Sequence, residues 1–202
     1  MMESLAGLGP ESREKLRLYQ ALVEKWNPHI NLVARSTLAD FQGRHIADSA
    51  FLMLHAPENP RLWADFGAGG GLPGLVVATI AQARGWDTRI VLVESDARKA
   101  TFLREAARQM GLAVDVRAER IESLAPLSAD VVSARALAAL EVLCGLASRH
   151  LAPDGLCLFP KGETFAEEVA AARKSWQFDL EAVANPGHKG SALLVLRNLR
   201  RA

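Results

Sequence analysis

The sequence predicts an α/β fold whose core is a doubly wound, mostly parallel sheet of seven strands. From residue 61 onward, short apolar runs alternate with longer stretches of helical periodicity. This order is typical of parallel strands joined by right-handed crossovers. The last two apolar runs, within residues 178–199, are instead joined by the short segment NPGHKG, which predicts an antiparallel hairpin at the end of the sheet.

The composition is that of a folded globular chain without a strong overall charge. Of the 202 residues, 50% are hydrophobic and 23% are charged, which excludes an intrinsically disordered chain. At roughly 150 residues per domain, we expect one domain with an extension. The net charge of +1 gives no strong field, so a histone-like protein that binds naked duplex is not expected.

The cysteines and the apolar stretches indicate a cytoplasmic protein. Cys144 and Cys157 lie in apolar runs and cannot form a disulfide framework, as suits a reducing compartment. The first residues lack the basic and apolar segments of a signal peptide. The longest uncharged stretch, residues 66–83, contains five glycines and a proline, so no membrane span is expected.

Residues 1–60 are expected to form a helical layer that packs on a second region over residues 61–202. Apolar residues recur at spacings of three and four within 10–26, which predicts a helix that the following Asn-Pro pair ends. A further helix is expected over residues 37–56, before a turn that reads PENPR.

In the second region, strands and helices are expected in strict alternation up to the terminal hairpin. The expected strands before the hairpin cover residues 62–66, 89–95, 113–119, 129–134 and 155–161. The expected helices cover residues 73–83, 97–110, 137–151 and 164–176. The first helix begins at a proline, which is favoured at the first helical position because its missing N–H costs nothing there.

The strongest signal is a glycine-rich loop between the first of these strands and its helix. Residues 65–74 read DFGAGGGLPG, and glycines let the backbone turn sharply and approach a ligand closely. In a doubly wound sheet this turn lies at the carboxyl end of the strand, where ligands bind. No Lys-Ser/Thr pair follows the glycines, which excludes a triphosphate-binding loop.

Two cofactors fit the glycine spacing. The three glycines that end at Gly74 spell the GxGxxG of a dinucleotide site, so a nicotinamide-dependent dehydrogenase stays an alternative. The three glycines from Gly67 to Gly71 spell GxGxG directly after an acid, Asp65. A carboxylate at this loop repels a pyrophosphate but attracts the ammonium and sulfonium of S-adenosylmethionine, so the acid favours S-adenosylmethionine.

Later loops at the same edge supply further candidate residues. Glu94 ends the next strand and can accept hydrogen bonds from two ribose hydroxyls. Ile121 and Glu122 follow the third strand, where a methyltransferase sheet borders the adenine. Arg135 follows the fourth strand and is expected to point into the same crevice.

Motifs that the sequence lacks exclude several classes of methyl acceptor. The segment after the fourth strand reads SARAL and lacks the Asn/Asp-Pro-Pro-aromatic run typical of adenine or cytosine amino methylation. Cys144 in a helix and Cys157 in a strand are not presented as the nucleophile that pyrimidine C5 methylation needs. Guanine N7 carries a free lone pair, so an in-line displacement there needs positioning and no general base.

The second expected helix carries a polar cluster that can face an acceptor. At 100° per residue, Arg44, His45, Asp48 and Ser49 fall on one arc of about 140°, and apolar residues fill the remainder. A solvated face with an Arg44–Asp48 pair is the alternative interpretation. His45 has no ligand spacing to another metal-binding side chain, so no metal site is expected.

Taken together, these stretches resemble the bacterial small-subunit (16S) ribosomal RNA guanine-N7 methyltransferase family, also called glucose-inhibited division protein B. The matching stretches run in order over residues 16–162 and comprise 26–32, 44–49, 65–74, 92–95 with Lys99, Phe102 and Leu103, 120–122, 133–136 and 160–162. The resemblance implies a Rossmann-like methyltransferase sheet, S-adenosylmethionine as cofactor, and an acceptor in the small ribosomal subunit or an assembly intermediate. A methyltransferase of another RNA, a protein or a small molecule, or a non-catalytic RNA-binding module, stays open.

The candidate residues form three groups. The cofactor-binding group is Asp65, Gly67, Gly69, Gly71, Leu72, Glu94, Ile121, Glu122 and Arg135. The expected catalytic residues are Arg44, His45 and Arg135. The expected RNA contacts are Arg44, His45, Asp48, Ser49, Lys161, Arg197, Arg200 and Arg201, of which the last three lie in a C-terminal tail, residues 188–202, that has no acidic residue and suits phosphate contact. The protein is expected to be a monomer.

Overall fold

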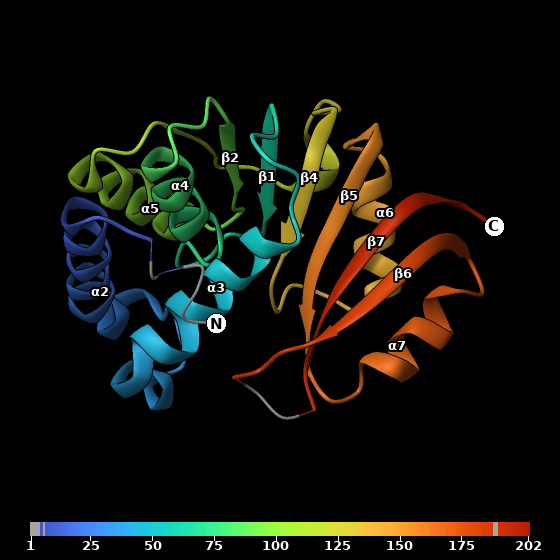
Figure 1. Ribbon diagram of the computed structural model, residues 1–202, viewed down its shortest axis with the longest axis horizontal. Coiled ribbons are helices and arrows are strands. Elements are labelled where there is room, and N and C mark those ends of the chain that lie inside the picture. Colours follow the sequence, from blue (N-terminus) through green and yellow to red (C-terminus); the bar gives the residue numbers. More distant parts are fainter. Residues whose placement is uncertain (1–4, 6, 188–189) are drawn as a thin grey trace.

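The computed structural model describes residues 5, 7–187 and 190–202, which form a sheet between two groups of helices (Figure 1). The sheet has seven strands in the order β3-β2-β1-β4-β5-β7-β6. Strands β1 to β5 pair in parallel, and β7 runs antiparallel to both of its neighbours. The strands are β1 (Leu62–Phe66), β2 (Arg89–Val93), β3 (Val114–Arg117), β4 (Ala129–Ala134), β5 (Leu151–Lys161), β6 (Trp176–Ala184) and β7 (Ala192–Arg201).

The helices cover both faces of the sheet, because side chains along each strand alternate between two apolar clusters. Trp63 of β1 packs with the helices before residue 111, and its neighbour Ala64 packs with those after residue 139. Figure 1 shows the first group at the left and the second at the right. The longer helices are α2 (Pro10–Ile30), α4 (Gly74–Ala83), α5 (Ala97–Met110), α6 (Leu140–Ser148) and α7 (Phe165–Ala172).

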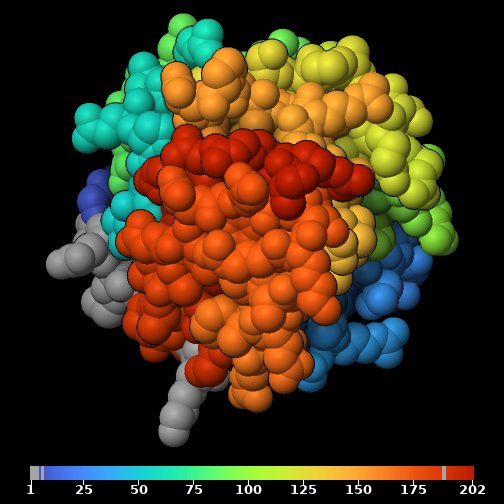
Figure 2. All heavy atoms as spheres, turned by 90° about the vertical axis from the view of Figure 1, so that its right-hand side faces the viewer, coloured from blue at the N-terminus to red at the C-terminus, as the bar shows by residue number. Residues whose placement is uncertain are grey.

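This architecture confirms the predicted fold class, including the terminal hairpin and the helical extension at the N-terminus. Strands β6 and β7 form the hairpin, and with α7 they dominate the face seen in Figure 2, where orange and red atoms predominate. Across the described parts of the chain, no helix is both long and apolar enough to cross a membrane.

Helix α2 continues past the Asn-Pro pair, so the prediction that this pair ends the helix was wrong. Pro28 lies in the last turn, where its missing N–H removes only one helical bond. The helix ends where Asn31 adopts the left-handed conformation, with a φ of 47°. The side-chain oxygen of Asn27 accepts hydrogen bonds from the backbone N–H groups of Leu32 (2.7 Å) and Val33 (2.9 Å), which turns the chain back.

The helix expected over residues 37–56 is a series of short helical turns. They are η1 (Arg35–Asp40) and η3 (Leu52–Leu54), both 3-10 helices, the π-helix η2 (Phe41–Ile46), and the α-helix α3 (Ala47–Phe51). A π-helical turn is wider than an α-helical one and shifts the residues around the axis. The expected polar arc is therefore wrong in part: His45 is 8% and Ser49 1% exposed.

A buried carboxylate fixes the start of the glycine loop. Asp65 at the end of β1 is fully buried, and its Oδ2 accepts a hydrogen bond from the backbone N–H of Gly74 (3.0 Å). Its Oδ1 accepts one from the hydroxyl of Ser133 on β4 (2.7 Å), whose Oγ in turn accepts one from Trp63 Nε1 (2.9 Å). These bonds tie β1, β4 and the first residue of α4 together below the loop.

Burial raises the pKa of Asp65 to about 7, against the opposing effects of its two hydrogen bonds and of Arg135. The native state therefore keeps a proton that the unfolded chain releases above its ordinary pKa of about 4. The resulting stabilisation is complete below pH 4 and is lost as the pH rises through 7.

We expect Asp65→Asn to remove this pH dependence, because an amide does not titrate in this range. Its oxygen can still accept from the N–H of Gly74, whereas its NH2 group would reverse the bond to Ser133 and donate to Oγ. Relative to the variant, the unfolding free energy of the unmodified chain should fall by roughly 3 kcal/mol between pH 4 and 7.5. Urea unfolding of both proteins across this range measures the difference. Parallel pH curves would show that Asp65 does not titrate in this range.

Candidate active site

The glycine loop forms one wall of a cleft of about 400 Å³ at the carboxyl ends of β1, β2 and β4. We call it the glycine-loop cleft. Its lining residues are Gly67, Gly69, Val93, Glu94, Ser95, Lys99, Glu119, Arg120, Ile121, Glu122, Ala136, Leu137, Ala138, Val142 and Leu146. Five of the predicted cofactor-binding residues thus lie together here: Gly67, Gly69, Glu94, Ile121 and Glu122.

The loop follows a path that needs glycine. Gly67 and Gly69 have φ angles of +62° and +53°, in the left-handed region that side chains disfavour. A Cβ atom on Gly67 would also lie 2.7 Å from a methyl carbon of Leu137 across the cleft. The bare backbone therefore leaves the cleft open at this point.

Glu94 holds the loop and faces the cleft at once. Its Oε2 accepts a hydrogen bond from the backbone N–H of Gly69 (2.8 Å), and its Oε1 accepts one from the N–H of Asp96 (2.8 Å). Each carboxylate oxygen has a second lone pair, so Glu94 retains acceptor capacity for hydroxyl groups of a ligand.

Two residues that the sequence analysis missed hold the opposite wall. Arg149, which follows α6, donates hydrogen bonds to the backbone carbonyls of Glu122 (2.7 Å) and Leu124 (2.9 Å). The adjacent His150 is bonded through Nε2 to the carbonyl of Ile121 (3.1 Å). These bonds fix the turn η4 (Ile121–Ser123), and no local sequence pattern reveals them because they join segments more than 20 residues apart.

A second and wider hollow of about 900 Å³ lies beside the cleft, and Ala136 lines both. We call it the Arg135 hollow. It is lined by Leu32, Val33, Ala34, Thr37, Arg44, His45, Asp48, Arg135, Ala136, Pro160, Lys161, Gly162, Glu163, Glu168, Asn185, Gly187, Ser191 and Ala192. The N-terminal helical layer and the end of the sheet both contribute to it.

Arg135 and His45 contact each other in this hollow. Arg135 Nη1 lies 3.1 Å from His45 Nδ1, and a guanidinium can only donate, so Nδ1 holds its lone pair. The proton of the neutral ring is then on Nε2, which donates to the hydroxyl of Thr37 (2.7 Å). Burial lowers the pKa of Arg135, although the nearby Tyr19 and Asp48 oppose this shift, and an arginine stays charged.

The other predicted RNA-side residues of this region hold the fold as well. Asp48 accepts a hydrogen bond from Asn185 (3.0 Å), which joins α3 to the segment after β6. Lys161 is 11% exposed, and its ammonium contacts Glu168 (2.7 Å) and the carbonyl of Ala138 (2.7 Å) in the loop after β4. Ser49 is buried, donates to the carbonyl of His45 and does not line the hollow.

Four predicted cofactor-binding residues lie away from the glycine-loop cleft. Asp65, Gly71 and Leu72 are buried and line neither the cleft nor the hollow, and Arg135 lines only the hollow. Gly74, the last glycine of GxGxxG, donates its N–H to Asp65 rather than facing the cleft. This arrangement is unfavourable for a pyrophosphate bound at the GxGxxG glycines.

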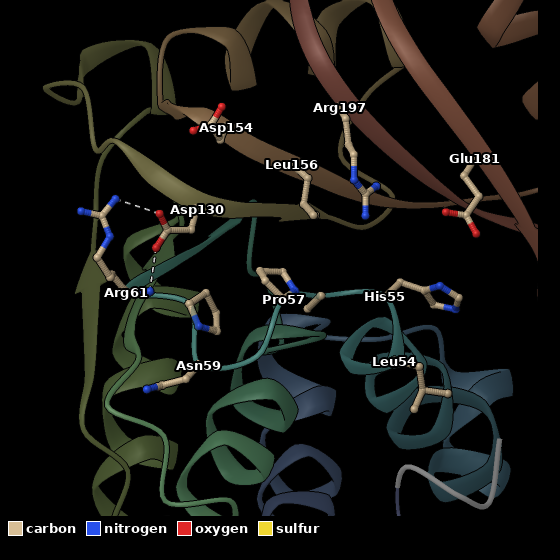
Figure 3. A pocket seen from close by; sticks show the side chains of 12 residues that line it. Leu54, His55, Pro57, Asn59, Arg61, Asp130, Asp154, Leu156, Glu181 and Arg197 are labelled. Atoms are coloured by element: carbon tan, nitrogen blue, oxygen red, sulfur yellow. Dashed lines mark hydrogen bonds and ion pairs between the residues drawn. The ribbon is translucent and has the colours of Figure 1, made fainter.

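The structure separates the basic tail from the Arg135 hollow. Arg197 lines a third hollow of about 700 Å³. Figure 3 shows it on the same hollow as the ion pair of Arg61 with Asp130, which lies at the amino end of β4. Further along β7, Arg200 donates to Gln177 (3.0 Å) and Arg201 stacks over Trp176 (4.9 Å). The predicted RNA contacts thus lie at two edges of the sheet, and His188 and Lys189 lie outside the described residues.

Neither cysteine is placed for nucleophilic attack. Both are buried, and burial raises the pKa of the Cys144 thiol to about 12 and that of Cys157 well above its ordinary value. Within the described ranges, no group of three or more His, Cys, Asp or Glu side chains could hold a metal ion.

Comparison with solved structures places the fold among methyltransferases. A methyltransferase from Geobacter sulfurreducens superposes with a TM-score of 0.57 at 19% identity, covering 96% of this chain and 92% of that one. The TYW2 protein of M. jannaschii, solved in complex with AdoMet, superposes with a TM-score of 0.55 at 16% identity, covering 80% and 77%.

Sequence comparison gives closer relatives. The family model GidB, rRNA small subunit methyltransferase G, matches residues 12–193. Ribosomal RNA small subunit methyltransferase G of Cereibacter sphaeroides is 52% identical over 94% of this chain and 92% of its own length. The protein of that name from a Ruegeria species is 46% identical over 95% and 93%. These matches confirm the family that the motifs indicated, and the chain therefore belongs to the GidB family, rRNA small subunit methyltransferase G.

Proposed function

We propose that this chain transfers a methyl group from S-adenosylmethionine to N7 of a guanine in 16S ribosomal RNA. The observation that carries the proposal is that the glycine-loop cleft and the Arg135 hollow meet at Ala136. The glycine-loop cleft can hold an adenosine-based methyl donor, and the Arg135 hollow can hold a base. The family relationship and the names of the relatives support ribosomal RNA as the substrate class.

The residues of the glycine-loop cleft fit S-adenosylmethionine. Glu94 can accept hydrogen bonds from the ribose hydroxyls through its remaining lone pairs. Ile121, Leu137 and Val142 offer apolar surface for the adenine ring, and the glycine loop leaves room for the amino acid part. When bound, this cofactor supplies a methyl group on a positively charged sulfur, which is open to in-line attack.

The Arg135 hollow suits an RNA base and its phosphates. Arg44 is exposed on its wall and can pair with a phosphate, and the half-buried Arg135 adds a second positive charge. We assign Arg44, His45 and Arg135 to the acceptor side, which is the part of the site that would hold the RNA base. Residues 1–60 form the helical layer that supplies the first two of these residues. Asp48 and Lys161 shape the same wall through their contacts with Asn185 and Glu168.

Methyl transfer to guanine N7 needs no general base, because this atom carries a lone pair at neutral pH. Neither ring nitrogen of His45 is available as a base, since one accepts from Arg135 and the other donates to Thr37. Positioning of the acceptor in line with the methyl group and electrostatic stabilisation of the cationic product then account for the rate.

We further propose that the chain acts as a cytoplasmic monomer on a small subunit or an assembly intermediate rather than on naked RNA. The net charge of only +1 supports this, because a substrate that already carries protein requires less phosphate neutralisation.

Gly67→Val is expected to abolish binding of S-adenosylmethionine, because it combines a left-handed backbone with a clash against Leu137 in the cleft. Gly111→Val is the matched control: its φ of +63° imposes similar strain on the same side chain, but a Cβ atom there would meet nothing within 4 Å. Titration calorimetry should give unchanged affinity for the control. Normal affinity in Gly67→Val would refute the placement of the methyl donor.

Alanine substitution of Arg44 or His45 is expected to impair turnover more than methyl-donor binding. Affinity for S-adenosylmethionine should stay within about threefold, and activity on small subunits that lack the modification should fall at least about tenfold, or ~1.4 kcal/mol. Arg84→Ala, which alters an exposed arginine stacked on Trp86, serves as control. Full activity of both variants would favour the view that these residues only stabilise the fold.

The chemical step is expected to need neither a base nor a thiol. Single-turnover rates should show no base-type rise between pH 6 and 9, and Cys144→Ala and Cys157→Ala should remain active in the folded fraction. A rate that rises tenfold per pH unit, or a covalent adduct with RNA trapped on either cysteine, would contradict a direct displacement.

A further inference from the structure

Tyr19 of α2 reaches from the N-terminal helical layer into the glycine loop. The side chain is fully buried, and its hydroxyl donates a hydrogen bond to the backbone carbonyl of Gly70 (2.5 Å). The hydroxyl oxygen of Tyr19 also packs against Gly71, since a Cβ atom on Gly71 would lie 3.1 Å from this oxygen. The hydroxyl therefore satisfies a buried carbonyl and limits the loop on its inner side.

The turn after α2 meets the same glycine. A Cβ atom on Gly70 would lie 3.1 Å from Cβ of Leu32 and 3.2 Å from its carbonyl oxygen. Asn27 fixes this turn through its hydrogen bonds to the backbone of Leu32 and Val33. Two parts of the helical layer thus contact one residue of the glycine loop.

The ring of Tyr19 also begins a series of contacts that reaches the Arg135 hollow. It packs edge-on against Phe41, with centroids 5.5 Å apart, and Phe41 packs edge-on against His45 at 5.3 Å. His45 in turn accepts the hydrogen bond from Arg135. An unbroken series of contacts therefore joins the glycine loop to the acceptor side through one buried tyrosine.

We propose that Tyr19 is a positioning residue that holds the glycine loop in the shape that binds S-adenosylmethionine and aligns it with the acceptor-side residues. The hydroxyl acts on the loop, and the ring acts on His45 through Phe41. This inference rests on the proposed placement of the methyl donor in the glycine-loop cleft.

Tyr19→Phe tests the first part, because it keeps the ring and its contact with Phe41 and removes only the hydroxyl. We expect the dissociation constant for S-adenosylmethionine to rise about three- to tenfold, the effect of one lost buried hydrogen bond. At saturating methyl donor, kcat on small subunits should stay within about twofold, since the ring still supports His45.

Leu22→Ala is the matched control for stability. Leu22 is a buried residue of the same helix that belongs to the apolar core. The Leu22→Ala substitution should lower the melting temperature at least as much as Tyr19→Phe does. It should leave the dissociation constant of the folded protein for S-adenosylmethionine unchanged. If both variants bind S-adenosylmethionine as the unmodified chain does, Tyr19 serves the fold alone and the proposal fails.

Phe41→Leu tests the second part and also serves if Tyr19→Phe does not fold. It keeps the hydroxyl bond to Gly70 but removes the aromatic contact between Tyr19 and His45. Affinity for S-adenosylmethionine should stay within about twofold, whereas kcat on small subunits should fall at least about fivefold. An unchanged kcat would overturn the link to the acceptor side.

The Gly67→Val protein separates this inference from the proposed function. If it binds S-adenosylmethionine normally, the cleft is not the methyl-donor site and the inference falls with it. If it loses binding while Tyr19→Phe behaves like Leu22→Ala, the site stands and only the role of Tyr19 is refuted.

Discussion

The buried carboxylate of Asp65 is the constraint on which the arrangement of the site depends. It joins the end of β1 to Ser133 on β4 and to the first residue of α4, so the glycine loop must leave and re-enter the fold at fixed points. The close packing here also explains a glycine at position 74, because a Cβ atom there would lie 2.8 Å from this carboxylate and closer still to a methyl carbon of Leu92. Between these anchors the loop turns outward, and Glu94 holds its outer part through Gly69.

The N-terminal helical layer lines the Arg135 hollow together with the end of the sheet. Its helices share one apolar cluster with α4 and α5, and its irregular turns carry Arg44 and His45 to the wall that Arg135 completes. The π-helical turn η2 carries His45, which is buried, packs against Phe41 and accepts a hydrogen bond from Arg135. The irregular backbone thus lies at the wall of the hollow that we propose receives the acceptor.

Sequence periodicity predicted the alternation of strands and helices in the second region, the hairpin and the cleft at the glycine loop, because these features follow from local patterns. It could not predict the π-helical turn, since apolar spacing does not distinguish a shift of one residue over a short segment. Contacts between distant segments, such as Arg149 with Glu122, leave no local signal. The position of the basic tail could not be predicted from composition either. Because β7 is antiparallel to β5, its course carries Arg200 and Arg201 away from the edge of the sheet where the parallel strands have their carboxyl ends.

In the function that we propose, the cleft and the hollow bring a methyl donor and a guanine N7 together. The most direct measurement maps the methyl group on 16S RNA after small subunits from cells without this protein are incubated with it and S-adenosylmethionine. N7-methylguanosine is cleaved by borohydride followed by aniline, so we expect new strand cleavage at one guanine, and only when the active protein has been added. A methyl group on a pyrimidine carbon or an exocyclic amine would contradict it.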